Sequence, residues 1–440
     1  METPIVDFVK GYASSDTLRL HMPGHKGMAL VGPESLDITE VTGADSLYDA
    51  QGIIARSEEN AAQLFGCPTF YSTEGSSHCI RAMLTLAAQY GLQQGRKPVI
   101  AAARNVHKTF LSAAALLDLQ VRWLYPEEGE SYLSCTLTPE KVDAFLQLHQ
   151  PIALYLTSPD YLGNVADVAA IAQVCHAREC LLLVDNAHGA YLRFLNPSRH
   201  PMDLGADLCC DSAHKTLPVL TGGAYLHISP NAPALFAEQA RNALGMFGST
   251  SPSYLILQSL DHANKLLEGW DIAAFGTQVE AMRRRLEEKG LIFYGNEPMK
   301  LTLDAGAMGC GTGVLCWQLQ EAGIEWEFAD PDYLVLMPSP AMPEEDLQRL
   351  EKALEALQIG NEEPVSLPEF APCKQVMSLR QAMLSPAETL PVEQCMDRIL
   401  AAPSVGCPPA VPIVVCGEQI DARAIKLMRY YGISHCTVVK

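Results

Sequence analysis

The chain has 440 residues, of which 48% are hydrophobic and 19% are charged, so it can hold two or three domains with large cores. Its formal net charge of −20 argues against nucleic acid and anionic membranes as partners, because both bind through basic surfaces. We expect a cytoplasmic protein, since the N-terminus lacks a secretory signal and no apolar run reaches membrane-spanning length.

The cysteine pattern points to reduced thiols. The 14 cysteines include no Cys-x-x-Cys pair, and several fall in segments that are expected to be buried. This pattern favours cysteines used as small apolar core residues and disfavours a metal cluster, so no metal is expected.

Residues 1–60 are rich in Gly and Pro and are predicted to form an N-terminal arm with short helices. From residue 61, short apolar runs alternate with helical patterns. The predicted strands are 70–73, 98–103, 121–125, 152–157, 181–185, 206–210 and 222–228. The predicted helices are 58–65, 76–94, 109–118, one opened by Thr138 as N-cap, and 168–178. This order predicts an α/β fold with a mostly parallel seven-stranded sheet sandwiched by helices.

Smaller parts follow this sheet. Residues 246–300 are predicted to be mostly helical, including 271–289. A Pro-rich linker is expected at 364–372, and the last segment should end in a strand at 437–439. The predicted domains are an arm (1–60), a large α/β domain (61–297), a small α+β domain (298–363) and a C-terminal domain (364–440).

Asp185 and Lys215 are the strongest chemical signal. Each is predicted at the carboxyl end of a buried parallel strand, the edge at which open α/β sheets bind ligands. A carboxylate there can keep a pyridine nitrogen protonated, and a desolvated lysine amine can condense with an aldehyde. This pair is what pyridoxal 5′-phosphate (PLP) needs to act as an electron sink, so we expect PLP as cofactor.

Further residues are candidates for the same site. Gly75, Ser76 and Ser77 open a helix whose free N–H groups favour a phosphate, although serine is also a common N-cap. Ser212 is a further candidate phosphate ligand. His107 either stacks on the cofactor ring or is an ordinary loop histidine, and His188 either lines the site or packs in the core. The loop His21-Met22-Pro23-Gly24-His25-Lys26-Gly27 is either a turn or a segment that closes over a site.

Several segments, in order along almost the whole chain, resemble the group I Orn/Lys/Arg decarboxylases, PLP enzymes of the aspartate-aminotransferase fold (fold type I). The matching segments are Pro23-Gly24-His25-Lys26-Gly27, Thr42-Gly43-Ala44-Asp45-Ser46-Leu47, Arg104-Asn105-Val106-His107-Lys108, Thr157-Ser158-Pro159-Asp160-Tyr161-Leu162-Gly163, Asp185-Asn186-Ala187-His188-Gly189-Ala190, Ser212-Ala213-His214-Lys215-Thr216-Leu217, Ser249-Thr250-Ser251-Pro252-Ser253-Tyr254, Pro408-Pro409-Ala410-Val411-Pro412 and Gly417-Glu418.

The resemblance implies a role for each site residue. Lys215 would carry PLP, Asp185 would pair with the pyridinium nitrogen, and His107 would stack on the ring. The phosphate and the reactive carbon would be surrounded by Ser76, Ser77, Ser212 and His214. Thr250 and Ser251 would approach the phosphate from a partner subunit, which implies at least a homodimer.

The implied reaction is the α-decarboxylation of lysine, arginine or ornithine to CO₂ and an amine that is a polyamine or its precursor. Lys215 or His214 would then protonate Cα. Glu418 would meet the side-chain cation of the substrate. Two alternatives remain: an aminotransferase or elimination lyase that uses the same cofactor on another amino acid, and a non-catalytic relative that binds PLP or a partner.

The chain departs from the family pattern at a few positions. The family usually has Glu at Asn186, Asn at Glu74, Gly at Pro218, Gln at Gly222 and Gly at Ala410. Long members carry an N-terminal wing domain that this chain lacks, so decamer assembly by that route is not expected. Because Lys215 and Asp185 are both present, these departures bear on substrate identity more than on cofactor binding.

Overall fold

The computed structural model describes residues 1–360, 368–403 and 409–440, and it divides into two compact units. The first unit comprises residues 1–97 and 181–272, and the second comprises residues 98–180 and 273–440. The domain boundaries predicted from the sequence stay a prediction, and part of the predicted linker, residues 364–367, lies outside the described residues.

The first unit combines four strands with helices from the N-terminal and central parts of the chain. Its elements are α1 (Pro4–Ala13), η1 (Pro33–Ser35), η2 (Leu47–Asp49), α2 (Ile53–Phe65), β1 (Thr69–Ser72), α3 (Gly75–Gln93), β5 (Leu181–Asp185), η3 (Ala190–Phe194), β6 (Leu208–Asp211), α7 (Ala213–Thr216), β7 (Ala224–Ile228), α8 (Ala234–Gly245) and α9 (Tyr254–Gly269). The strand order is β1-β7-β6-β5, with β5 and β6 parallel and the other pairs antiparallel. All residues of β5, β6 and β7 are buried, which explains their nearly continuous apolar sequences.

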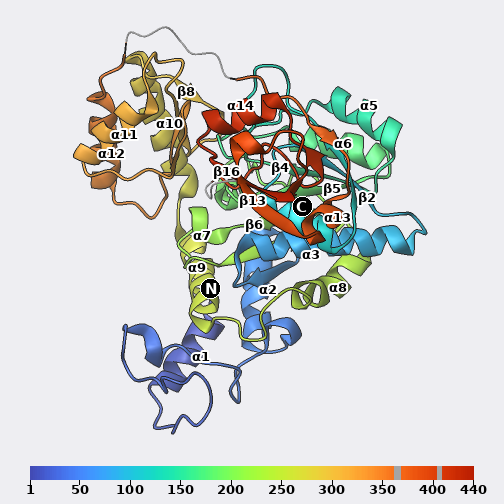
Figure 1. The fold of residues 1–440 in the computed structure, drawn as a ribbon. Helices are drawn as coiled ribbons and strands as arrows, with labels where there is room; N and C mark the ends of the chain where they lie inside the picture. The colour runs from blue at the N-terminus through green and yellow to red at the C-terminus, as the bar shows by residue number, and fades with distance from the viewer. Residues whose placement is uncertain (361–367, 404–408) are drawn as a thin grey trace. The chain divides into compact units, whose positions relative to one another are not determined.

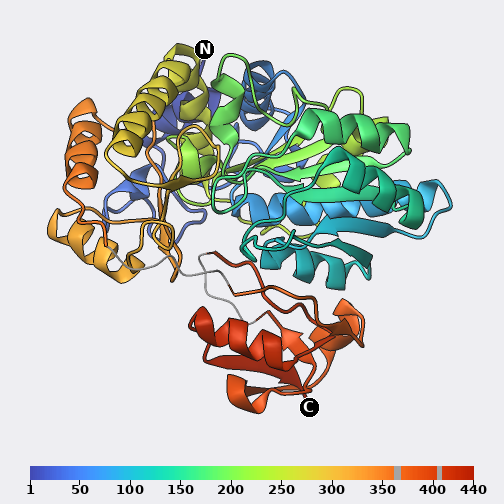
Figure 2. The same cartoon turned by 90° about the horizontal axis from the view of Figure 1, so that it is seen from above.

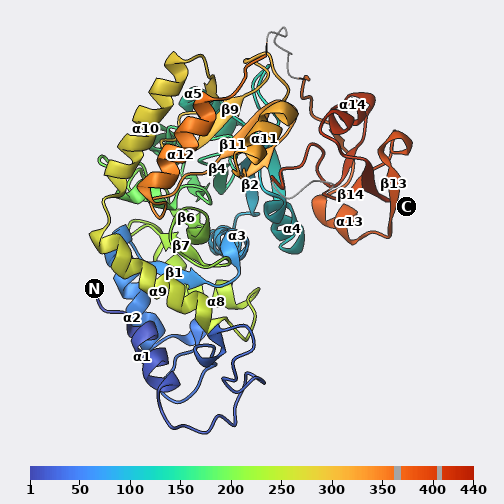
Figure 3. The same ribbon diagram turned by 90° about the vertical axis from the view of Figure 1, so that its left-hand side faces the viewer.

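Helices cover this sheet and hold the N-terminal arm. α3 packs against β6 and β7 and against α8, a helix that the sequence analysis did not predict (Figure 1). α1, α2 and α9 pack together (Figure 3), and the Asp261 carboxylate of α9 accepts the N–H groups of Ile5 and Val6 at the start of α1. The first turn of α1 is therefore fixed to the rest of this unit.

The second unit contains the remaining strands of the α/β pattern and two smaller sheets. Its elements are β2 (Val99–Ala103), α4 (Lys108–Leu116), β3 (Gln120–Leu124), α5 (Pro139–His149), β4 (Ala153–Thr157), α6 (Val168–Ala177), α10 (Ile272–Glu288), β8 (Phe293–Tyr294), β9 (Leu301–Asp304), α11 (Thr312–Glu321), β10 (Phe328–Ala329), β11 (Tyr333–Leu336), α12 (Glu344–Glu355), β12 (Lys374–Gln375), α13 (Leu379–Leu384), β13 (Ala387–Pro391), η4 (Val392–Gln394), β14 (Leu400–Ala402), β15 (Glu418–Gln419), α14 (Ala422–Tyr430) and β16 (His435–Val439). β2 pairs in parallel with both β3 and β4. The two units together thus carry the seven predicted strands.

Local sequence explains several boundaries in this unit. The Thr138 side chain accepts the N–H of Lys141, as an N-cap does, and Pro139 is the first residue of α5, as the sequence predicts. Between α9 and β9, in contrast, the predicted helical region 246–300 is interrupted by loops and by β8.

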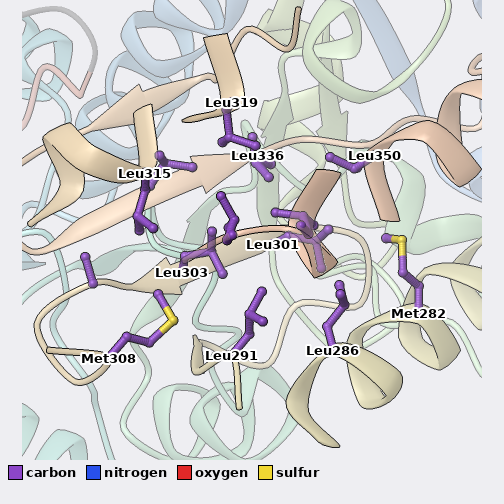
Figure 4. Close-up of a cluster of buried hydrophobic side chains, with 14 of the residues drawn as sticks. Met282, Leu286, Leu291, Leu301, Leu303, Met308, Leu315, Leu319, Leu336 and Leu350 are labelled. Atoms are coloured by element: carbon purple, nitrogen blue, oxygen red, sulfur yellow. The ribbon is translucent and has the colours of Figure 1, made fainter. Parts of the chain in front are cut away.

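A leucine-rich core holds the small sheet β10-β11-β9-β8 against α10, α11 and α12. Figure 4 shows Leu301 and Leu303 of β9 facing Leu286 and Met282 of α10, with Leu315 of α11 and Leu350 of α12 closing the cluster. The spacing of these leucines at helical and strand periods is why the segment 298–358 forms its own α+β cluster.

The C-terminal residues also form a regular structure, although their sequence pattern is weak. β13, β16 and β14 form an antiparallel sheet, and α14 packs on it through Leu427 and Met428 (Figure 2). The described cysteines are all free, most of them buried. No helix in the described ranges combines the length and the apolar character needed to cross a membrane.

Candidate active site

Asp185 is the last residue of β5, a buried strand that pairs in parallel with β6. The register of β5 and β6 places Asp185 opposite Cys210, and the side chain of Asp185 is only 2% exposed. Its Oδ1 atom accepts the N–H of Ala187 at 3.2 Å and the Cys210 thiol at 3.7 Å. This edge of the sheet is where the sequence places the ligand-binding carboxylate, and burial suits it to a protonated nitrogen.

Lys215 lies on the short helix α7 and not at the end of a strand, so the predicted strand end was wrong. β6 stops at Asp211, and the N–H groups of Lys215 and Leu217 bond to the carbonyls of Ser212 and Ala213. These local hydrogen bonds satisfy the backbone N–H groups within a helical turn. In a continued strand, the same groups would need a neighbouring strand as partner. The amine is half-buried, and its Nζ atom lies 2.9 Å from Nε2 of His188.

The start of α3 meets the residue that follows β6. The Ser212 hydroxyl donates to Oγ of Ser76 at 2.7 Å, and both side chains are buried. Gly75, the first residue of α3, has φ 72°, and its N–H donates to the carbonyl of Gly222 at 2.7 Å. Ser77, which is half-buried, follows Ser76 in the first turn of α3. The hydroxyls of Ser76 and Ser77 thus lie at a helix N-terminus, an arrangement that favours a phosphate.

Gly222 explains one departure from the family pattern. Its φ is 103°, and a Cβ atom there would lie 2.8 Å from the carbonyl oxygen of Thr73. Only glycine therefore fits where the backbones at positions 222 and 73 come this close. A glutamine at position 222 would force the two segments apart.

A buried polar network surrounds Asp211, next to the site. The Asn186 side-chain amide donates to Oδ1 of Asp211 at 2.7 Å, while His200 and His227 contact Oδ2 through Nε2 at 3.0 and 3.1 Å. Burial alone would raise the pKa of Asp211, but the two imidazoles outweigh it and hold this pKa well below its usual range. Sequence reasoning missed this network, because its members are up to 41 residues apart and no spacing rule connects them.

His214 has its ring fixed by the backbone. Its Nδ1 atom lies 2.9 Å from the carbonyl oxygen of Gly223, so Nδ1 carries the hydrogen in this contact. Burial lowers the pKa of His214, and the positive charge of Lys215 lowers it further. The ring is therefore neutral near pH 7, with a bare Nε2 atom.

His107 belongs to the second unit, where it caps a helix. Its Nδ1 atom accepts the N–H of Thr109 at the start of α4 at 3.2 Å, and its side chain is half-buried. The N–H of Lys108 donates to the carbonyl of Ala410 at 2.8 Å, which brings the C-terminal motif beside this segment. Ala410 has φ 58°, a conformation that glycine adopts more easily, and Pro408 of the same motif lies outside the described residues.

Glu418 is 1% exposed and is engaged by its own chain. Its Oε2 atom lies 3.3 Å from Nη2 of Arg104 and accepts the N–H of Val415 at 2.8 Å. Arg104 also donates to the carbonyls of Pro412 and Ile413 at 2.9 Å. Burial raises the pKa of Glu418, and Arg104 opposes this shift. The structure thus gives Glu418 an internal partner, and its contact with a substrate cation stays a prediction.

Thr250 and Ser251 are exposed, on the loop between α8 and α9. The N–H of the preceding Ser249 donates to Oε1 of Glu74 at 2.5 Å, so Glu74 ties this loop to the start of α3. This contact gives the departure at position 74 a structural role.

The donor set of the first unit fits PLP. It contains a half-buried amine (Lys215), a buried carboxylate at the neighbouring strand end (Asp185) and a helix N-terminus with the bonded hydroxyls of Ser76 and Ser212. These are the groups that an aldehyde, a pyridinium nitrogen and a phosphate each require.

The fold agrees with this chemistry. The constitutive lysine decarboxylase of E. coli superposes on 100% of this chain with a TM-score of 0.77, at 18% identity and over 82% of its own length. Lysine decarboxylase A of Pseudomonas aeruginosa superposes with a TM-score of 0.79 at 17% identity, over 99% of this chain and 80% of its own. An alanine–glyoxylate aminotransferase from Nostoc shares the fold over 69% of this chain, with a TM-score of 0.54 at 18% identity over 86% of its own length. The fold and the site therefore define a fold type I PLP-dependent enzyme.

Sequence comparison specifies the family. The family model of the Orn/Lys/Arg decarboxylase major domain matches residues 3–332. The arginine decarboxylase of Bacillus subtilis is 30% identical over 96% of this chain and 92% of its own length. The arginine decarboxylase of Halalkalibacterium halodurans is 29% identical over 97% of this chain and 93% of its own. The chain belongs to the Orn/Lys/Arg decarboxylase family, as the sequence motifs indicate.

Proposed function

We propose that the substrate of this PLP-dependent decarboxylase is arginine, which loses its α-carboxylate as CO₂ and becomes the corresponding guanidino amine. The observation that carries this choice is the extent of similarity. Proteins named arginine decarboxylase match 96–97% of the chain, whereas the lysine decarboxylases of P. aeruginosa and E. coli match 51% and 55% of it in sequence.

The test is a substrate panel. Purified protein with PLP is given L-arginine, L-lysine and L-ornithine, and CO₂ and amine products are quantified. Arginine should have a kcat/KM at least roughly tenfold above lysine, since a pocket built for one cation discriminates against another by about 1–3 kcal/mol. A preference for lysine or ornithine would reject arginine, and a keto acid without CO₂ would favour an aminotransferase instead.

In this proposal, Lys215 holds the cofactor covalently and Asp185 keeps its ring nitrogen protonated. Bound PLP supplies a sink for the electron pair left at Cα when the carboxylate departs. His188 lies beside the amine, and the phosphate is held by Gly75, Ser76, Ser77 and Ser212. Borohydride reduction and peptide mapping should place the label on Lys215, and the Lys215→Ala variant should carry no label and release no CO₂. A label on another lysine would overturn the assignment.

Lys215 is the better candidate to deliver a proton to Cα. His214 carries its hydrogen on Nδ1, which faces the Gly223 carbonyl, and its lowered pKa leaves Nε2 unprotonated near neutral pH. A lysine ammonium has three donors and can release one while it keeps a contact to His188. His214→Gln should therefore retain most of the CO₂ release, whereas a loss as large as that of Lys215→Ala would assign the step to His214.

A homodimer with shared sites would explain why the N-terminal arm and the loop with Thr250 and Ser251 are exposed in the first unit. The arm exposes large apolar side chains, among them Leu18 (78%), Leu20 (83%) and Val31 (91%). Such a patch usually marks an interface, and Thr250 and Ser251 are exposed as a contribution to a second copy requires. Mixing inactive Lys215→Ala with an inactive Thr250→Glu variant should restore up to about a quarter of the activity if subunits exchange. No restoration by exchanged subunits would place each site within one chain.

The free thiols support a cytoplasmic location, where cysteines stay reduced. Recovery of the protein outside the cytoplasmic fraction of the cell would exclude this location.

A further inference from the structure

A pocket of about 520 Å³ lies within the second unit, along one edge of β3 and outside the group of residues assigned to PLP. β3 pairs with β2 and is the last strand in the order of its sheet, so its other edge is open. The pocket volume is in the range of small-molecule sites. The wall of the pocket includes Gln120, Arg122, Trp123 and Tyr125 from this edge, and Val376 and Met377 from the segment that follows β12.

Arg122 brings a positive charge to this pocket that no acidic group balances. It is exposed, so a ligand can reach its guanidinium group, and it is the only charged residue among the described residues that line the pocket. In the ranges that the structure describes, Arg122 makes no hydrogen bond or ion pair. A guanidinium group in this state presents a planar fork of N–H donors, which matches the geometry of a carboxylate.

Two aromatic rings of the same strand edge line the pocket beside Arg122. Trp123 and Tyr125 are both half-buried, so part of each side chain is open to the pocket. Successive side chains of a strand point to opposite faces of the sheet. Because the pocket follows the open edge of β3, a ligand there can reach Arg122 on one face and the two rings on the other.

The charges behind these rings cancel each other. The guanidinium group of Arg104 lies 5.5 Å from the centre of the Trp123 ring and forms the buried pair with Glu418. Arg104 and Glu418 are 2% and 1% exposed, and neither is among the residues that line the pocket. The pair is neutral as a whole, so the charge that a ligand meets in the pocket is that of Arg122.

The opposite wall of the pocket offers apolar surface, because its polar side chains are already bonded. The side-chain amide of Gln375 donates to two backbone carbonyls at 2.5 and 3.1 Å. Ser378 and Gln381 form the capping box of α13, in which each side chain accepts the backbone N–H of the other residue. The side chains of Val376, which is 42% exposed, and of Met377 remain as contact surface, and such surface favours the hydrophobic part of a ligand.

We propose that this pocket binds a small aromatic carboxylic acid, whose carboxylate pairs with Arg122 and whose ring lies against Trp123 and Val376. A purely apolar ligand would leave Arg122 without an anion, and a small hydrophilic anion would leave the rings uncovered. The site uses residues of the second unit alone. It therefore does not depend on the assignment of Lys215 or on the proposed decarboxylation.

The probe is 3-phenylpropionate, measured by titration calorimetry on the full-length protein with PLP. It should bind with one site per chain. Its neutral amide, 3-phenylpropionamide, has nearly the same shape and should bind at least about tenfold more weakly, because the charge-assisted hydrogen bonds to Arg122 are lost. This comparison needs no variant. Equal binding of the acid and the amide, or no binding of the acid, would overturn the proposal.

Variants locate the site. Arg122→Gln should weaken 3-phenylpropionate about tenfold or more, and Val376→Asp, which places a negative charge on the exposed opposite wall, should weaken it at least as much. Arg284→Gln, which removes a 71% exposed arginine of the same unit, should leave binding unchanged.

Lys215→Ala distinguishes this pocket from the PLP site. The variant should bind 3-phenylpropionate as the unaltered protein does, so a protein that releases no CO₂ can still pass this test. A carboxylate bound at the PLP site would instead be lost in Lys215→Ala and retained in Arg122→Gln, and either of these results would overturn the proposal.

Discussion

The Nζ atom of Lys215 lies 2.9 Å from the Nε2 atom of His188. At this distance one of the two nitrogens donates a hydrogen to the other. His188 follows β5 by three residues, and Lys215 follows β6 by four. The contact therefore holds the amine near the strand edge at which Asp185 ends β5.

His188→Ala should lower kcat of CO₂ release roughly tenfold, or about 1.4 kcal/mol, with KM nearly unchanged, because it removes the hydrogen-bond partner that orients the amine. His188→Gln supplies an amide oxygen and should recover part of the loss. Borohydride labelling of Lys215 should persist in both. The exposed His262→Ala serves as control. A His188→Ala enzyme with unaltered kcat would remove this positioning role.

Ser212→Ala should weaken PLP binding about five- to tenfold, since it deletes a hydroxyl of the proposed phosphate site and leaves Ser76 without its donor. The measurement is a fluorescence titration of the PLP-free protein with PLP. Ser385→Ala, on an exposed helix end of the second unit, is the matched control. Identical affinities in the two variants would show that Ser212 does not hold the phosphate.

Asn186→Asp should lower the thermal stability of the protein. The amide of Asn186 donates to Asp211, and a carboxylate at this fully buried position would face a second carboxylate, at a cost of roughly 2–4 kcal/mol. Differential scanning calorimetry of Asn186→Asp beside the exposed Asn242→Asp measures the difference. Equal melting temperatures would contradict the network described around Asp211.

Glu418→Gln separates two roles for this residue. If Glu418 serves to neutralise Arg104, the variant leaves a buried guanidinium uncompensated, and the melting temperature should fall by the equivalent of about 3 kcal/mol while KM stays constant. Glu393→Gln, in an exposed ion pair with Arg429, should change neither quantity. A large rise in KM with unaltered stability would instead support the substrate contact that the family resemblance implies.

Asp330→Asn should stabilise the protein increasingly as pH rises. The pKa of Asp330 is about 7 in the folded chain against a usual 3.8, so the folded chain retains a proton that the unfolded chain releases. The stability that comes from this proton is complete below about pH 4 and is lost as pH rises through 7. Between pH 5.5 and pH 8 the advantage of the asparagine variant should grow by roughly 1–2 kcal/mol. A constant difference across this range would mean that Asp330 titrates normally.

The sequence by itself determined the chemistry and most of the elements. Leu181–Asp185 is a strand because four apolar residues precede a polar strand end, and Thr138 begins α5 because its hydroxyl can cap the helix. Ordered motifs were enough to identify the family, since they are short segments whose order along the chain is visible in the sequence.

Only the tertiary structure decided which groups face each other. Arg104 and Glu418 are 314 residues apart and form one buried pair, and Asp211 takes its partners from three separate segments. Lys215 sits on a helical turn because β6 ends at Asp211, opposite Tyr225 of β7, and the backbone beyond it bonds within the turn. The strength of an ionic contact depends on burial and on every neighbouring charge, and these quantities exist only after the chain has folded.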